Sequence, residues 1–229
     1  MKSAVIVFPG SNCDRDIAVA LKAVCGGNVD MVWHGERNLP KVDLVAVPGG
    51  FSYGDYLRPG AMAAHSPVME SVVKSASMGV AIIGICNGFQ VLTECGLLPG
   101  ILMRNRDLKF ICRATTLEVA TNDSLFTSEY TYHDIITMPI AHNEGNYFAD
   151  QETLEELESE DRIAFRYSSR CGTLPNQISP NGSANSIAGI LSSTRRVLGM
   201  MPHPERAVDE NHVCKDGQNL FKSLVMHLA

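Results

Sequence analysis

The stretch VAIIGICNGFQVLTECG, residues 80–96, carries an apolar run into a helix-like run across one cysteine that stands between two glycines. The run VAIIGI is short and apolar throughout, which is typical of a central strand of a parallel sheet with both faces buried. A residue at a sharp strand-to-helix turn presents its side chain at the carboxyl edge of the sheet and needs small neighbours two positions before and after it. Gly84 and Gly88 fill those positions, so the stretch predicts a nucleophile elbow at Cys86.

Two interpretations of Cys86 are open at this point. A free cysteine is commonly a small core hydrophobe, and the chain has seven cysteines. The start of a helix directly behind the sulfur, however, favours the thiolate, which is the reactive form of cysteine. The elbow therefore favours a reactive cysteine over a structural one.

Strand-like and helix-like runs alternate through the first half of the chain. This alternation is typical of βαβ units in a parallel sheet. Pro67 and Gly79 bracket one helix-like run, because proline suits the first turn of a helix and glycine follows its end. The expected strands are SAVIVF (3–8), VDMVW (29–33), VDLVAVP (42–48) and VAIIGI (80–85), and the expected helices are 14–24 and VMESVVKSA (68–76).

After LLPG (97–100) the pattern changes to shorter β-rich pieces, which predicts a mixed or antiparallel extension of the same sheet. The acidic segment 149–161 is expected to form a solvated helix, and the Asn-, Ser-, Pro- and Gly-rich segment 172–186 a surface loop. No repeat or long linker divides the chain, so we expect a single domain over residues 1–229. The remaining expected strands are KFICRATTLEVA (109–120), IITMPIA (135–141), RIAFRYS (162–168), SIAGIL (186–191) and RRVLGMMP (195–202), followed by a helix over 218–227.

Composition narrows the class of protein. The chain of 229 residues is long enough to bury a substantial core, and none of its cysteines has CxxC spacing, so neither a zinc ribbon nor a disulfide framework is suggested. The apolar run in MKSAVIVFPGSN is too short for a signal peptide, and no run approaches a membrane span. The net charge of −6 opposes binding to nucleic acid or to an anionic membrane. We expect a soluble cytoplasmic protein whose substrates are small or are carried by a partner.

A cysteine nucleophile in acyl transfer needs a base and a group that orients the base. His203 stands in MMPHPERA directly after a strand-like run, with Glu205 two residues further on. In an extended segment these two side chains point to the same side, and Pro204 stiffens that conformation. A surface His-Pro turn is the alternative. Paired with the elbow, the segment predicts that Glu205 orients His203 and that His203 faces Cys86.

An oxyanion formed by attack on a carbonyl needs donors that are already in place. The amide of Asn87, at the start of the predicted helix, is one candidate. Gly49 and Gly50 follow another predicted strand, and a glycine there lets a backbone amide approach a substrate; an ordinary tight turn is the alternative. Cys13, in SNCDRD, is expected to belong to a helix-starting turn capped by Asn12 or Ser11 rather than to a catalytic group.

Four blocks of the sequence resemble the class I, triad-type glutamine amidotransferases, whose marks are a GxCxGxQ elbow and a late HxE. Within that class the resemblance is closest to one family, the glutaminase subunits of phosphoribosylformylglycinamidine synthase, an enzyme of purine biosynthesis. It extends over essentially the whole chain. It implies a flavodoxin-like fold, with a mostly parallel central sheet covered by helices on both faces. The blocks are PGSNCDRD (9–16), PGGFSYGDYLRPGA (48–61), GICNGFQVL (84–92) and MMPHPERA (200–207).

The resemblance also implies roles for single residues. Cys86 would be the nucleophile, His203 the acid–base and Glu205 its orienting group. Gly50 and Asn87 would supply the oxyanion hole, and Gln90 would help to hold glutamine. The segment PIAHNEGNY (139–147) matches a family block near the glutamine site, which implies a substrate contact by His142, although Asn143 and Asn146 depart from the usual pattern.

The same resemblance implies a partner for the ammonia that is released. A separate large synthetase subunit would bind ATP, Mg²⁺ and formylglycinamide ribonucleotide, and a small third subunit would bridge the two. The chain has no GxxxxGK[ST] or GxGxxG motif, and we expect no cofactor or metal in this chain. The exposed loop expected at 51–58 is the candidate for partner contact. Two alternatives stay open: a stand-alone cysteine hydrolase on the same fold, and an inactive regulatory subunit.

Overall fold

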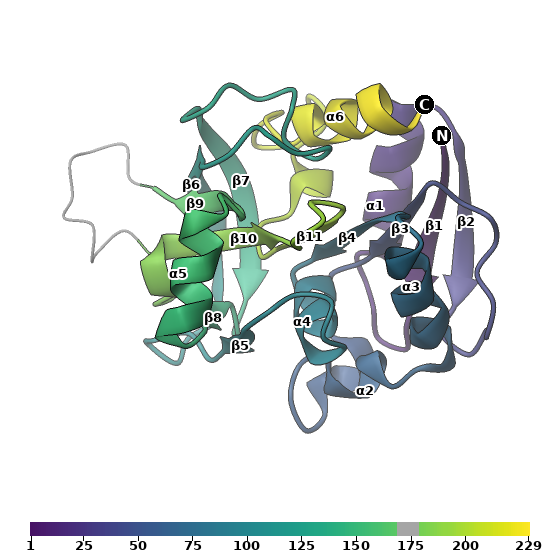
Figure 1. The fold of residues 1–229 in the computed structure, drawn as a ribbon, viewed down its shortest axis with the longest axis horizontal. Coiled ribbons are helices and arrows are strands. Elements are labelled where there is room, and N and C mark those ends of the chain that lie inside the picture. The colour runs from purple at the N-terminus through teal and green to yellow at the C-terminus, as the bar shows by residue number, and fades with distance from the viewer. Residues whose placement is uncertain (169–178) are drawn as a thin grey trace.

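The computed structural model describes residues 1–168 and 179–229 (Figure 1). Its strands are β1 (Lys2–Val7), β2 (Asn28–Trp33), β3 (Leu44–Val47), β4 (Ala81–Ile85), β5 (Ile101–Met103), β6 (Ile111–Val119), β7 (Ile135–His142), β8 (Asn146–Phe148), β9 (Ile163–Tyr167), β10 (Ile187–Leu191) and β11 (Val197–Met200). Its helices are α1 (Asp14–Ala20), α2 (Ala61–Ala64), α3 (Pro67–Ser77), α4 (Asn87–Glu94), α5 (Gln151–Ser159) and α6 (Gln218–Leu228). Short 3-10 or π turns lie at Leu21–Cys25, Ser52–Asp55, Ala184–Ser186 and Pro204–Arg206.

Within these described ranges, nine strands form one sheet in the order β2-β1-β3-β4-β11-β10-β9-β6-β7. Neighbours from β2 to β11 pair parallel, and neighbours from β11 to β7 pair antiparallel. The short strands β5 and β8 pair with each other in a second sheet. Figure 1 places α1 and α6 on one side of the parallel strands and α2 and α4 on the other. The predicted α/β fold, a parallel sheet with an antiparallel extension, is confirmed.

The centre of the sheet forms where the sequence is most apolar. Every residue of β3, β4, β10 and β11 is buried, as expected for strands covered on both faces. Helix α3 begins at Pro67, whose missing amide is tolerated in a first helical turn, and buries an apolar stripe that includes Val68 and Val72. The buried strands and helix α3 form a rigid support for the sheet edge on which the candidate functional residues lie.

Three strand ends meet at one edge of this sheet. The register pairs Val47 of β3 with Gly84 of β4, and Ile85 of β4 with Met200 of β11, with all three strands parallel. The carboxyl ends of adjacent parallel strands open into one crevice, where ligands commonly bind. The segments that follow these strands, at 48–50, 86–90 and 201–205, are therefore brought together.

Two local predictions need correction. Helix α1 is capped by Cys13 without a side-chain hydrogen bond, because the Ser11 hydroxyl accepts instead from the Phe8 amide at 3.3 Å. The predicted surface loop at 172–186 falls partly outside the described residues, and its described part is not a simple surface loop. Asn181 is fully buried and donates to the Gly145 carbonyl at 2.6 Å. Its polar side chain is buried because it satisfies a backbone carbonyl that would otherwise lack a partner.

The acidic segment behaves as predicted. Helix α5 is capped by Asp150, whose carboxylate accepts from the Thr153 amide at 2.8 Å, and Leu157 is its buried residue. Leu154 is partly buried and also packs against the core, while the glutamates of the helix are exposed. Among the described residues, no helix is both long and apolar enough to cross a membrane.

Candidate active site

Cys86 lies at the predicted elbow between β4 and α4. Its backbone has φ 51° and ψ −107°, a strained conformation for a residue other than glycine, and its amide donates to the Met200 carbonyl at 2.7 Å. A Cβ on Gly88 would lie 1.9 Å from the Val47 carbonyl oxygen, and one on Gly84 would lie 2.7 Å from the Gly88 carbonyl oxygen. Larger residues at either position would force the turn apart, so the two glycines allow the sharp turn that presents the thiol.

His203 and Glu205 form a buried pair beside this turn. Their Nδ1 and Oε1 atoms lie 2.6 Å apart, and each residue is only 2% exposed. The His203 amide donates to the Pro139 carbonyl at 2.9 Å, which fixes the segment against β7. The extended geometry expected for this segment is wrong, because Pro204–Arg206 forms a 3-10 turn, yet the turn still brings the two side chains together.

The electrostatics of His203 follow from this pairing. Burial by itself lowers the pKa of His203, but the Glu205 carboxylate and the Cys86 sulfur outweigh it and raise the pKa well above its ordinary value near 6.5. With Nδ1 bound to Glu205, the ring nitrogen Nε2 has no hydrogen-bond partner among the described residues. That nitrogen is thus free to exchange a proton with a reacting group.

The glycine turn after β3 brings the histidine and the cysteine together. A Cβ on Gly49 would lie 2.8 Å from Cε1 of His203 and 3.4 Å from the Cβ of Cys86. The next residue, Gly50, has φ 134°, and a Cβ there would lie 2.6 Å from the Asn12 amide nitrogen. Both positions require glycine, and the His203 imidazole and the Cys86 side chain both pack against Gly49.

Asn87 and Gln90 open helix α4 and are almost completely buried. The backbone amide of Asn87 belongs to the first helical turn, whose amides have no partner within a helix. The Asn87 side chain accepts from the Ser52 amide at 3.0 Å and donates to Gln90 Oε1 at 2.9 Å. Gln90 in turn donates from Nε2 to the Glu144 carbonyl at 2.5 Å. The oxyanion and substrate residues predicted from sequence are therefore adjacent and tied to one another.

A cavity of about 170 Å³ opens in front of the Cys86 thiol. One wall comes from the segments that follow β3 and β4, and the other from the end of β7 and the residues that follow it. Cys86 Sγ lies 3.6 Å from the Ala141 carbonyl oxygen on that second wall. The cavity is lined by Gly50, Phe51, Asp55, Pro59, Cys86, Gln90, Ala141, His142, Asn143 and Glu144.

His142 forms part of the second wall and is 3% exposed. Burial, together with the charge of nearby His203, lowers the pKa of His142 to about 4, so its imidazole is neutral at physiological pH. Its Nδ1 lies 3.1 Å from Asn105 Oδ1, which also accepts from the Gly145 amide at 3.1 Å. The predicted His142 thus lies at the cavity, held by Asn105, a residue that no sequence motif singled out.

Cys13 lies closer to these groups than the sequence suggested. Its sulfur, a ring nitrogen of His203 and a carboxylate oxygen of Glu205 all fall within 4.8 Å of one another. Such a set can hold a metal ion, but Arg206 Nη2 already donates to the Cys13 sulfur at 3.3 Å. A guanidinium at this distance opposes a bound cation. We therefore describe Cys13 as a packing neighbour of the His203 imidazole and not as a metal ligand.

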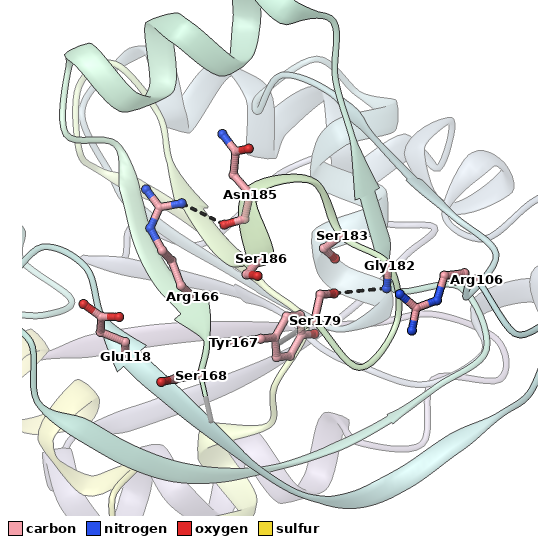
Figure 2. Close-up of a pocket in the computed structure, with 10 residues that line it drawn as sticks. All are labelled: Arg106, Glu118, Arg166, Tyr167, Ser168, Ser179, Gly182, Ser183, Asn185 and Ser186. Atoms are coloured by element: carbon pink, nitrogen blue, oxygen red, sulfur yellow. Dashed lines mark hydrogen bonds between the residues drawn. The ribbon is translucent and has the colours of Figure 1, made fainter. Parts of the chain in front are cut away.

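A second, larger cavity of about 440 Å³ shares no lining residue with the Cys86 cavity (Figure 2). It is polar, but its Arg166 guanidinium is already bound to the Asn185 carbonyl at 2.8 Å and to Glu158 at 2.6 Å. Figure 2 shows Ser179 accepting from the Gly182 amide, at 3.0 Å, within the same wall. The side chains of Arg166 and Ser179 are thus held by neighbouring groups of the same region, and no cysteine or histidine is among the described residues that line this cavity.

Comparison with known proteins matches the whole chain. The family model of the CobB/CobQ-like glutamine amidotransferase domain matches residues 1–225. The chain is 57% identical over 228 residues to phosphoribosylformylglycinamidine synthase subunit PurQ of Novosphingobium aromaticivorans, covering 99% of this chain and 97% of that protein. It is 56% identical over 230 residues to the subunit of the same name from Zymomonas mobilis, covering 100% of both chains.

A similar solved structure is that of PurLQS from Thermotoga maritima. One chain of it matches with a TM-score of 0.87 and 41% identity, covering 100% of this chain and 99% of that chain. Both the strand arrangement and the sequence therefore agree with these relatives from end to end.

Proposed function

This chain belongs to the glutamine amidotransferase family of the PurQ subunits, and from that premise we propose that Cys86, His203 and Glu205 hydrolyse glutamine to glutamate and ammonia. The observation that carries the proposal is the elbow cysteine, which lines a cavity and lies beside a buried His–Glu pair. The chain is an amidotransferase subunit of phosphoribosylformylglycinamidine synthase, and its ammonia serves synthesis of formylglycinamidine ribonucleotide in purine biosynthesis.

The reaction begins with the Cys86 thiolate and the His203 imidazolium that the raised pKa of His203 favours. The sulfur attacks the side-chain carbonyl of glutamine, and the amides of Gly50 and Asn87 stabilise the oxyanion. His203 gives its proton to the departing nitrogen, so ammonia leaves and a glutamyl thioester remains. His203 then takes a proton from water, which hydrolyses the thioester. Glu205 holds the imidazole in place and stabilises its charged form.

The remaining site residues hold the substrate. Gln90 is fixed between Asn87 and the Glu144 carbonyl, so its amide is already oriented when glutamine enters. His142 completes the opposite wall as a neutral imidazole. We place both residues in glutamine binding, and we assign the whole of residues 1–229 to one glutaminase domain.

Ammonia released here needs a second active site. We propose that a large synthetase subunit supplies ATP and Mg²⁺ chemistry and that a small subunit bridges the two; the name PurLQS of the similar Thermotoga maritima structure supports such an assembly. The loop 51–58 borders the cavity and exposes Tyr56 and Leu57, which are 71% and 77% exposed, so it is the proposed contact. We propose no cofactor in this chain, and a cytoplasmic location where glutamine and the nucleotide substrate occur.

The test uses ammonia release and product synthesis in the assembled synthase. Cys86→Ala is expected to abolish glutamine-dependent synthesis while leaving synthesis from added ammonium intact, because the ammonia-consuming site lies on another chain. Loss of both activities would contradict the division of labour. A lone chain as fast as the assembly would favour a stand-alone hydrolase, and an assembly that releases no ammonia from glutamine would favour an inactive subunit.

A further inference from the structure

Two carboxylates line the Cys86 cavity without a role in the thioester chemistry. Asp55 comes from the loop after β3, and Glu144 comes from the segment after β7. Asp55 Oδ1 accepts from Asn87 Nδ2 at 3.1 Å, and the Asn87 amide group also holds Gln90. One hydrogen-bonded chain thus links Asp55 to the residue that we place against the substrate.

Among the described residues, no buried lysine or arginine forms an ion pair with either carboxylate. Burial, followed by the charge of Glu144, raises the pKa of Asp55 to about 6, so the cavity disfavours its ionised form. Arg104 approaches Glu144 at 3.5 Å, but its side chain is 71% exposed. Arg58 lies in the same loop as Asp55 and is bound to Glu94 at 2.5 Å. The two carboxylates therefore suit a ligand that carries a positively charged group.

The loop that carries Asp55 has an energetically unfavourable backbone conformation. Tyr53, Asp55 and Leu57 have φ values of 55°, 54° and 70°, in the left-handed region that such residues rarely adopt. The loop is anchored by the Tyr53 hydroxyl, which lies 2.7 Å from His34 Nδ1 and 2.9 Å from Ser66 Oγ. Strain of this kind persists only where the surroundings impose it, and it is commonly found at ligand sites. Here it directs the Asp55 carboxylate to the cavity.

We propose that Asp55, assisted by Glu144, binds the α-ammonium group of glutamine and makes the site selective for amides that carry such a group. The inference rests on the proposed function, because it assumes that the amide carbon of glutamine lies at Cys86. With the amide there, the amino-acid end of the substrate extends along the same cavity, away from the thiol. Charge-assisted hydrogen bonds from an ammonium to two carboxylates give both affinity and orientation.

Matched substrates isolate the ammonium contact. Glutaramate is glutamine without its α-ammonium, and 4-aminobutanamide is glutamine without its α-carboxylate. In the assembled synthase, Asp55→Asn is expected to raise KM for glutamine roughly 10- to 100-fold with a much smaller change in kcat. It should lower kcat/KM for 4-aminobutanamide by a similar factor and leave that for glutaramate nearly unchanged. Glu144→Gln should show the same pattern to a smaller extent.

Asparagine preserves the size of Asp55 and its acceptor for Asn87, and it removes the repulsion with Glu144. The Tm of the Asp55→Asn protein is therefore expected to equal or exceed that of the native protein, whereas a purely structural role for Asp55 would lower it. Asp107→Asn is the control, because Asp107 is exposed and lies outside the cavity; its kinetics should be unchanged.

Two results would overturn the inference alone: a native KM for glutamine in Asp55→Asn, or an equal loss on glutaramate and glutamine. Failure of the native assembly to release ammonia from glutamine would overturn the proposed function itself, and this inference with it. The two failures are distinguished by the activity of the unsubstituted protein.

Discussion

The parallel and antiparallel halves of the sheet contribute different parts of the active site. The parallel strands β3, β4 and β11 end in the groups that we propose take part in the reaction: the glycine turn, the thiol and the His–Glu pair. The antiparallel strand β7 ends in a wall that carries His142 and Glu144 and that accepts the His203 amide at Pro139. The proposed chemistry thus comes from one half, and the cavity is enclosed by residues from both.

The two histidines show the same division. His203 on the parallel edge is buried against a carboxylate, and its pKa is raised, so it is prepared to carry a proton. His142 on the antiparallel wall is buried without a carboxylate, and its pKa is lowered to about 4. Two neighbouring buried imidazoles are therefore driven to opposite charge states. Changes to the His–Glu pair on the parallel edge should alter turnover, and changes to the antiparallel wall should alter binding.

The largest expected effect is on the parallel edge. Glu205→Gln keeps the size of the side chain but removes the charge that stabilises the His203 imidazolium. The turnover number should fall on the order of 10³-fold while KM for glutamine changes little. Steady-state ammonia release measures both quantities. An unchanged turnover number would remove Glu205 from the mechanism, and a change confined to KM would place it in substrate binding.

A larger residue at the elbow should lower the free energy of unfolding. Gly88→Ala places a Cβ 1.9 Å from the Val47 carbonyl oxygen, so β3 and α4 must move apart, at a cost of about 2 to 3 kcal/mol in unfolding free energy. Urea unfolding measures this cost. Gly35→Ala is the control, because a Cβ at Gly35 meets only the Trp33 side chain at an ordinary 3.4 Å. Equal stabilities for the two variants would show that the turn is not constrained by packing.

A substitution that loosens the antiparallel wall should weaken glutamine binding. Asn105→Ala removes the side chain that holds His142 and the Gly145 amide, so the wall loses its fixed position. We expect KM for glutamine to rise about 10-fold with a smaller effect on turnover. Asn122→Ala is the control, since Asn122 is exposed and lies outside the cavity. A fall in turnover without a change in KM would contradict the division between the two halves.

The smallest expected effect is the pH dependence of stability. The unfolded chain protonates His142 near pH 6.5, but the folded chain does so only near pH 4, so stability is lost as the pH falls through this window. His142→Gln should reduce that loss by about 1 kcal/mol for each pH unit below 6.5 within this window. His203 has the opposite sign: its contribution is present below pH 6.5 and is lost as the pH rises through its raised folded pKa. Urea unfolding of the native and His142→Gln proteins across this pH range isolates the contribution of His142. His203 and Asp55, whose raised pKa values affect stability in the opposite sense, contribute equally to both unfolding curves. Parallel curves for native and His142→Gln proteins would contradict the assignment.

Short local patterns made much of this architecture predictable. The apolar run before Cys86 and the glycines at 84 and 88 are enough to predict a strand, a turn and a helix, because each depends on residues a few positions apart. The parallel first half, the antiparallel extension and the solvated helix α5 are confirmed for the same reason. The cap of α1 was wrong because Ser11 and Asn12 each had several acceptable partners, and only the folded chain selects among them.

The sequence by itself determined the elbow, the late His–Glu segment and the succession of strands and helices along the chain, since these follow from local periodicity, small residues and a motif of fixed spacing. Only the tertiary structure decided that Asp55, Asn105 and Glu144 converge with Cys86, and that Cys13 lies behind His203. These residues are separated by long stretches of chain, and their proximity depends on the register of β3, β4 and β11 and on how β7 packs across their ends. Burial and the neighbouring charges then shift the pKa values of His142 and His203 in opposite directions. The residue type alone predicts neither shift.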